Sequence, residues 1–183
     1  MAAKTKQAKS DRGQGTKKVG KMTMTLEEDR TIIFTREFNA PRTLVFEAYT
    51  KPEHITRWWG PRRYSTIVDK MDVRPGGVWR FINRDAEGQE FGFNGVYREV
   101  VPPTRIVQTF EFEGMPGHVS VETATFEERN GKTIVTSKAV FASAEDRAGI
   151  LQTDMAEGFA ESMDRLEELL QTLGKEKHNG RKK

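Results

Sequence analysis

The stretch "DMAEGFAESMDRLEELL", from Asp154 to Leu170, decides the fold class. Its apolar residues recur at spacings of three and four, which predicts an amphipathic helix. We expect the helix to run from about Glu145 to Leu173, after a cap at Ser143, and to be roughly 40 Å long. Its apolar stripe comprises Leu151, Met155, Phe159, Met163, Leu166, Leu170 and Leu173. Because the opposite side is acidic, the stripe needs one covering layer, and the preceding sequence predicts a sheet.

Several short runs before this helix alternate apolar and polar residues. "RTIIFTREF" (Arg30–Phe38) predicts a first strand, and two short helices follow, one in residues 39–50 and one from about Pro52 to Gly60. Six further strands are predicted at residues 64–73, 78–84, 91–101, 105–113, 119–128 and 133–141. Short turns join them, which is typical of an antiparallel meander. We therefore predict an α+β fold in which a curved antiparallel sheet of about seven strands grips one long C-terminal helix.

Charge separates the two ends of the chain from its middle. Residues 1–22 carry a net charge of +6 and residues 174–183 carry +4, so residues 23–173 carry −7 of the total of +3. We predict a disordered basic tail at residues 1–26, one folded domain at 27–173 and a second disordered basic tail at 174–183. Basic tails can hold nucleic acid electrostatically, but a solubilising end is the simpler interpretation.

Composition and motifs exclude several classes of protein. The chain has no cysteine, which excludes disulfides, thiol nucleophiles and cysteine–zinc sites. No apolar run approaches the roughly 18 residues of a membrane span, and residues 1–22 lack the apolar core of a signal peptide, so we expect no membrane insertion and a cytoplasmic protein. Neither an HExxH nor a GxSxG motif occurs. We therefore predict no catalytic residue, no metal and no cofactor.

Four segments resemble a known family. They are "REFNAPRTLVFEAYTKPEHITRWWGP", "MDVRPGGVWRF", "GVYREVVPPTRIVQTFEF" and the helix stretch quoted above, and the resemblance extends from about Arg30 to Leu173. They are similar to the START-like (SRPBCC) superfamily, and most of all to its branch of activator of heat-shock chaperone ATPase homologue-like proteins. The resemblance implies the helix-grip fold, with a mostly apolar cavity between helix and sheet. Superfamily members bind sterols, lipids or polyketides, and a few are cyclases or hydrolases.

The resemblance points to a binding protein for an apolar, lipid- or polyketide-like small molecule. The branch takes its name from one domain of a cochaperone in which a separate preceding domain makes much of the chaperone contact. A short basic tail stands there in this chain, so we do not expect chaperone binding. Two alternatives stay open: an enzyme that uses the same cavity, with Glu122 as general acid–base, and an interaction module that acts through the tails.

Strand alternation identifies the candidate lining of the cavity. The predicted ligand-binding residues are Trp58, Trp59, Tyr64, Trp79, Phe81, Phe93, Tyr97, Gln108, Phe110, Phe112, Glu122, Met155, Phe159 and Met163. Tyr97, Gln108 and Glu122 are the expected polar contacts. An ordinary packed core would have the same aromatic pattern, and curvature of the strands could instead expose Gln108 and Glu122.

Two further choices stay open at this stage. Small residues flank Glu122 on one face of strand 119–128 and recur in strand 133–141, which would leave space if these faces point inward; the opposite face of strand 119–128 is the alternative. For the adjacent Trp58 and Trp59, we expect one ring to plug the core and the other to line the entrance of the cavity. The sequence does not say which, and both could simply seal the end of the sheet.

Overall fold

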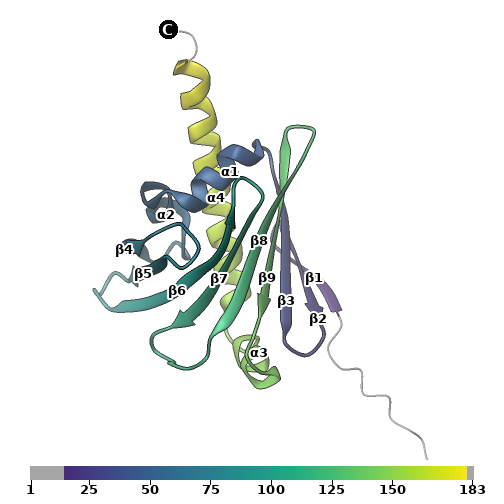
Figure 1. The fold of residues 1–183 in the computed structure, drawn as a ribbon, viewed down its shortest axis with the longest axis vertical. Helices are drawn as coiled ribbons and strands as arrows, with labels where there is room; N and C mark the ends of the chain where they lie inside the picture. The colour runs from purple at the N-terminus through teal and green to yellow at the C-terminus, as the bar shows by residue number, and fades with distance from the viewer. Residues whose placement is uncertain (1–14, 181–183) are drawn as a thin grey trace, which may run out of the picture.

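The computed structural model describes residues 15–180, with side chains to residue 176 (Figure 1). One antiparallel sheet of nine strands curves around a long helix, and the strand order is β1-β2-β3-β9-β8-β7-β6-β5-β4. The elements are β1 (Gly15–Val19), β2 (Met22–Glu27), β3 (Thr31–Phe38), α1 (Arg42–Thr50), α2 (Pro52–Trp58), β4 (Ser65–Met71), β5 (Val78–Arg84), β6 (Glu90–Val101), β7 (Arg105–Phe112), β8 (Ser120–Arg129), β9 (Lys132–Val140), α3 (Ala144–Ile150) and α4 (Met155–Gly180).

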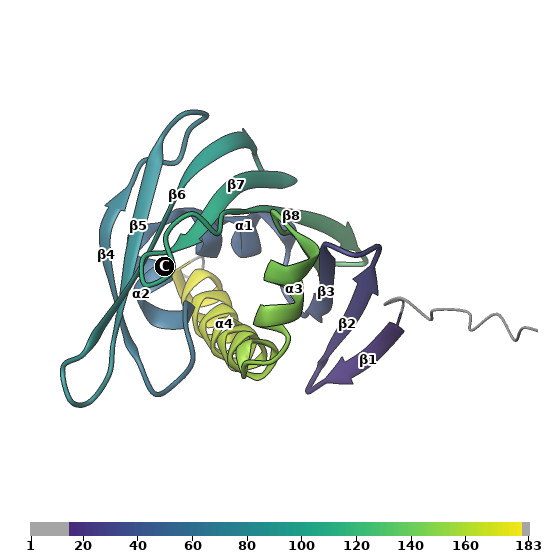
Figure 2. The ribbon, with the colours of Figure 1, turned by 90° about the horizontal axis from the view of Figure 1, so that it is seen from below.

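The predicted α+β architecture is confirmed. Figure 2 shows α4 in the concave side of the sheet, with β1 to β3 flanking it on one side and β4 to β6 on the other. Helices α1 and α2 lie at one end of the sheet and α3 at the other (Figure 1). In the described residues no helix combines the length and the apolar character required to span a bilayer.

The N-terminal segment corrects the predicted disordered tail and raises the strand count from about seven to nine. β1 and β2 form a hairpin over Gly20 and Lys21, and β2 pairs with β3. Met22 and Met24 alternate inward and are buried, as is Val19 across the turn, because this hairpin covers the flank of the helix–sheet core. Residues 1–14 lie outside the described part of the chain, as do 181–183.

The long C-terminal helix is interrupted, which corrects its predicted course from Glu145 to Leu173. α3 ends at Ile150, residues 151–154 form turns, and α4 begins at Met155. The Thr153 hydroxyl donates to the Ile150 carbonyl and accepts from the Met155 amide. Such local side-chain bonds compete with helical ones. At its other end α4 continues to Gly180, through a segment predicted to be disordered.

A buried arginine attaches α4 to the sheet. Arg36 lies on the inner face of β3, and 3% of its side chain is exposed. Its guanidinium donates to Asp164 and Glu167 of α4, each over 2.7 Å. Farther along the chain, Arg165 donates to the Gly60 carbonyl over 2.7 Å. These two arginines therefore fix α4 both to β3 and to the turn that follows α2.

Candidate functional site

The strand registers align the inward side chains of the sheet in rows. One row crosses the middle of the sheet: Tyr97 of β6 pairs with Gln108 of β7, and Gln108 pairs with Glu122 of β8. Ala139 and Ile32 continue the row on β9 and β3. We call Tyr97, Gln108 and Glu122 the polar row. Their positions confirm that Gln108 and Glu122 share an inner face, because that face also holds the buried Tyr97 and Ile32.

Aromatic rings cover the sheet on the β4–β6 side of the polar row. Phe81, Phe93 and Phe112 are register partners across β5, β6 and β7, and Phe110 lies between Phe112 and the polar row. The centroids of Phe93 and Phe110 are 5.6 Å apart, and those of Phe93 and Phe112 are 5.1 Å apart. Trp79 packs against Phe81 and Phe110. The result is an aromatic wall that begins one register row away from Glu122.

Small residues border the polar row on the opposite side. Ala124 of β8 pairs with Ser137 of β9, and Phe34 of β3 completes this row. Of the two faces that the sequence left open for β8, the one with Glu122 and Ala124 points inward, together with Ser137 and Ala139 of β9. Phe159 of α4 packs on Phe34 with a centroid distance of 4.9 Å. The remaining crevice between Phe34, Phe159 and Met163 is too narrow to hold a water molecule, so side chains fill this part of the gap between helix and sheet.

The inner face around the polar row is less tightly closed. Phe110, Glu122 and Ala139 keep part of their surface accessible to solvent, and so do Met155 and Phe159 on the facing side of α4. Helix α3 buries none of its residues at this end of the sheet. It is joined to the preceding β7–β8 loop by His118, whose Nδ1 lies 2.7 Å from Asp146 Oδ1. The partly accessible surface therefore belongs to these residues of the sheet and of α4, while Trp58, Phe126 and Leu166 seal the end at α1 and α2.

Glu122 is the electrostatically unusual residue of the site. Burial raises the pKa of its carboxyl group to about 7, and the hydrogen bond from Gln108 only partly offsets this effect. That bond is long, with 3.4 Å between Gln108 Nε2 and Glu122 Oε2. The one basic side chain found on the inner face of β3, Arg36, already binds two carboxylates. Burial therefore brings the titration of the Glu122 carboxyl group near neutral pH, and no ion pair between it and a basic side chain occurs within the described residues.

Two phenols and one indole lie in or against the core. Burial raises the pKa of Tyr97 and of Tyr49, so both phenols keep their protons. Tyr49 Oη interacts with Ser137 and with Met163 Sδ, and the Glu122 charge contributes to its raised pKa. Among the described side chains, the Trp79 indole nitrogen is buried without a hydrogen-bond partner. Unpaired buried polar groups of this kind are costly unless a ligand or water satisfies them.

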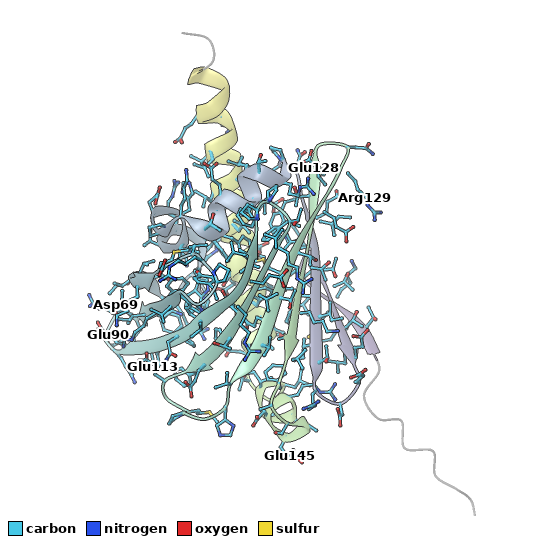
Figure 3. All side chains as sticks on the ribbon, in the orientation of Figure 1. Asp69, Glu90, Glu113, Glu128, Arg129 and Glu145 are labelled. Atoms are coloured by element: carbon cyan, nitrogen blue, oxygen red, sulfur yellow. The ribbon has the colours of Figure 1, made fainter. Side chains whose placement is uncertain are left out.

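The charged residues labelled in Figure 3 lie at the periphery of the fold. Figure 3 shows Asp69, Glu90 and Glu113 near the β4–β6 edge and Glu145 at the α3 end. Arg80 binds Glu113 and Asp69 on the outer side of this edge. No group of three or more His, Asp or Glu side chains within the described range is arranged to hold a metal ion.

Comparison with known proteins identifies the family. The profile of the Activator of Hsp90 ATPase homolog 1-like proteins matches residues 39–171. The chain belongs to this family. The match runs from the residue after β3 to the second half of α4 and so includes the polar row and the aromatic wall. The family resemblance inferred from the sequence is thereby confirmed. No curated protein matches the chain.

Solved structures share the fold over nearly their full length. A protein from Rhodobacter sphaeroides is 20% identical, with a TM-score of 0.79 over 83% of this chain and 99% of the other. A protein from Mycobacterium smegmatis is 25% identical, with a TM-score of 0.71 over 86% and 96%. A protein from Staphylococcus epidermidis is 28% identical, with a TM-score of 0.70 over 80% and 92%. These likenesses support the helix-grip fold; they do not identify a ligand.

The two adjacent tryptophans occupy different places in the structure. Trp58 is 3% exposed, its Nε1 donates to the Ala48 carbonyl over 2.9 Å, and its ring packs on Tyr49. It is therefore the ring that plugs the core, between α1 and α2. Trp59 follows α2 in extended conformation and is half-buried. Its ring meets Phe81 and Phe93 edge-on at 5.3 and 5.2 Å, so Trp59 joins the aromatic wall.

The structure brings most of the other predicted residues together on one face. Tyr64 is the exception: it packs on Phe91, beyond Phe93 along β6 and away from the polar row. Met163 is buried under Tyr49 and lies in the core. The sequence interpretation missed Tyr49 and Ser137 as site residues. The position of Tyr49 on the apolar face of the first predicted helix was the only feature of the sequence that pointed to an inward side chain.

Proposed function

We propose that the chain binds a small, largely apolar molecule between the sheet and α4, at the polar row. The observation that carries the proposal is Glu122 itself: an inward carboxyl group with a pKa near 7, one weak hydrogen bond and partly open surroundings. An interior that only had to be stable would be filled with apolar groups at this position. Membership of the Activator of Hsp90 ATPase homolog 1-like family and the helix-grip fold support a ligand in this place.

The surroundings define what such a ligand must offer. The aromatic wall of Phe93, Phe110 and Phe112 provides contact area for an apolar or aromatic body. Phenol, amide and carboxyl groups of the polar row provide hydrogen bonds at one end. A few convergent polar groups in an otherwise apolar pocket orient a ligand and give specificity.

Native mass spectrometry of the purified chain tests the proposal. We expect a co-purified mass that is lost on denaturation, or stabilisation by apolar compounds in a thermal-shift screen. Phe110→Ala should weaken binding by at least tenfold because it removes wall surface next to the polar row. Val78→Ala is the control. Val78 is an exposed residue of β5 that pairs with the exposed Val96 of β6, so its truncation removes no surface from the aromatic wall. A chain with no bound mass and no stabilising compound would refute the proposal.

A further inference from the structure

The charge balance of the inner face narrows the class of ligand. Among the described residues, the Glu122 carboxyl group has one hydrogen-bond donor, the Gln108 amide at 3.4 Å. Arg36, two register rows away along β9 and β3, is engaged by Asp164 and Glu167. The inner face therefore presents an acidic group without the cation that would normally accompany it in a protein interior.

The groups beside Glu122 favour a cation in two ways. Phe110 lies in the next register row, toward the aromatic wall, and aromatic faces attract ammonium groups. Ala139 is the register partner of Glu122 on β9 and Ala124 is the next inward residue of β8, and neither of these short side chains brings a charge. Gln108 donates to the carboxylate, and Tyr97, the register partner of Gln108 on β6, is a neutral phenol, so neither brings a competing positive charge.

We propose that the ligand carries one basic nitrogen on an apolar body, and that its ammonium group pairs with the Glu122 carboxylate. This inference rests on the proposed function, since it assumes that the inner face is the binding site. The apolar body would lie on Phe93, Phe110 and Phe112, and the nitrogen would point to the polar row. Transfer of the Glu122 proton to the amine, or its release to solvent, balances the charge on binding.

The pairing predicts a specific pH dependence. The amine must be protonated and the carboxyl group ionised, so binding should strengthen by about tenfold between pH 6 and pH 8, as Glu122 ionises. The other ionisable groups facing Glu122 are Tyr97 and Tyr49, and burial raises the pKa of both. Both therefore stay neutral over this interval, and the affinity change reports Glu122.

Three probes of one shape test the proposal: naphthylmethylamine, naphthylmethanol and naphthoic acid, each titrated into the full chain by calorimetry at pH 6 and pH 8. We expect the amine to bind at least tenfold more tightly than the alcohol at pH 8, and the acid most weakly. Glu122→Gln should remove the preference for the amine over the alcohol and the pH dependence of amine binding. Glu127→Gln, an exposed carboxylate on the same strand, is the control and should change neither.

The outcomes separate the ligand class from the proposed function. If the alcohol binds as tightly as the amine, or if Glu122→Gln still prefers the amine, the proposal of a basic nitrogen is refuted. The proposed small-molecule site is then still supported. If none of the three probes binds but native mass spectrometry detects a co-purified neutral compound, the same conclusion follows. If no probe binds and no co-purified mass is found, both proposals fall.

Discussion

Gln108 and Glu122 face each other across β7 and β8, and the 3.4 Å between the amide nitrogen and the carboxylate oxygen is the only hydrogen bond this carboxyl group makes within the described residues. A charge-assisted bond is normally shorter, at 2.7–2.9 Å. The pair therefore stabilises the ionised carboxyl group weakly, and burial dominates its titration. This relationship has a consequence for stability as well as for binding.

The first prediction concerns the pH dependence of unfolding. The pKa of Glu122 is about 7 in the folded chain against 4.5 for a free side chain, so the folded state holds a proton that the unfolded state releases. The free energy of unfolding should therefore fall as pH rises from about 4.5 to 7, by up to about 3 kcal/mol. Glu122→Gln abolishes this titration, so the variant should gain stability relative to the parent as pH rises.

Urea unfolding of both chains at pH 5, 6, 7 and 8 measures this difference. Other groups titrate equally in the two chains, and the difference between their unfolding free energies isolates Glu122. A difference that stays constant from pH 5 to pH 8 would show that Glu122 has an ordinary pKa.

The inward position of Glu122 shows which strand faces could be predicted from the sequence and which could not. Period-two alternation placed Phe81, Phe93, Tyr97, Gln108 and Phe110 on one face, and the registers confirm it. The face of β8 stayed ambiguous because its residues alternate small and polar with β-branched ones, so hydrophobicity did not distinguish the two sides. Pairing with β7 and β9 decides the matter, and pairing is a long-range property.

Two features could not be predicted because tertiary contacts override the local pattern. The β1–β2 hairpin is rich in Lys and Thr, and only its packing against the core shows that Val19, Met22 and Met24 form a buried face. The break before α4 depends on Thr153, whose hydroxyl replaces helical hydrogen bonds, although apolar spacing continues across it. Tyr49 was recognised as an apolar helix residue, but the reach of its hydroxyl depends on how α1 crosses the sheet.

The second prediction concerns the arginine that joins β3 to α4. Arg36→Met keeps the apolar stem but removes the partner of Asp164 and Glu167, and we expect it to lower the free energy of unfolding by about 2–3 kcal/mol. The loss stays below that of a fully buried pair because both carboxylates are partly hydrated.

An exposed ion pair between β3 and β9 supplies the control for Arg36. Lys132→Met removes the partner of Glu37, and both of these side chains are about half exposed. Its effect should stay within about 0.5 kcal/mol in the same denaturant titration. If both variants lower the free energy of unfolding equally, Arg36 attaches α4 to β3 no more strongly than an exposed ion pair does.

The third prediction concerns the turn after α2. Gly60 has a φ of 83°, and a Cβ atom there would lie 2.8 Å from Asn83 Oδ1. Asn83 is itself buried and accepts a hydrogen bond from Thr66. Gly60→Ala should therefore combine backbone strain of about 1–2 kcal/mol with a displaced hydrogen bond.

Gly88 separates these two contributions, because it has a similar φ of 86° and open space around its Cα atom. Gly88→Ala should show the strain alone. Thermal unfolding of both variants should therefore give a lower midpoint for Gly60→Ala by several degrees. Indistinguishable midpoints would mean that Asn83 moves aside without cost.

The fourth prediction tests whether the N-terminal hairpin belongs to the folded core. Met22 is fully buried and lies in the same cluster as Phe34 and Met163. Met22→Ala should lower the free energy of unfolding by about 2–4 kcal/mol, because it removes a long side chain from a packed interior. Met115, which is 57% exposed in the β7–β8 loop, is the matched control, and Met115→Ala should change stability by no more than about 0.5 kcal/mol. If Met22→Ala behaves like the control in urea unfolding, the packing of the hairpin on the core does not contribute to the stability of the domain.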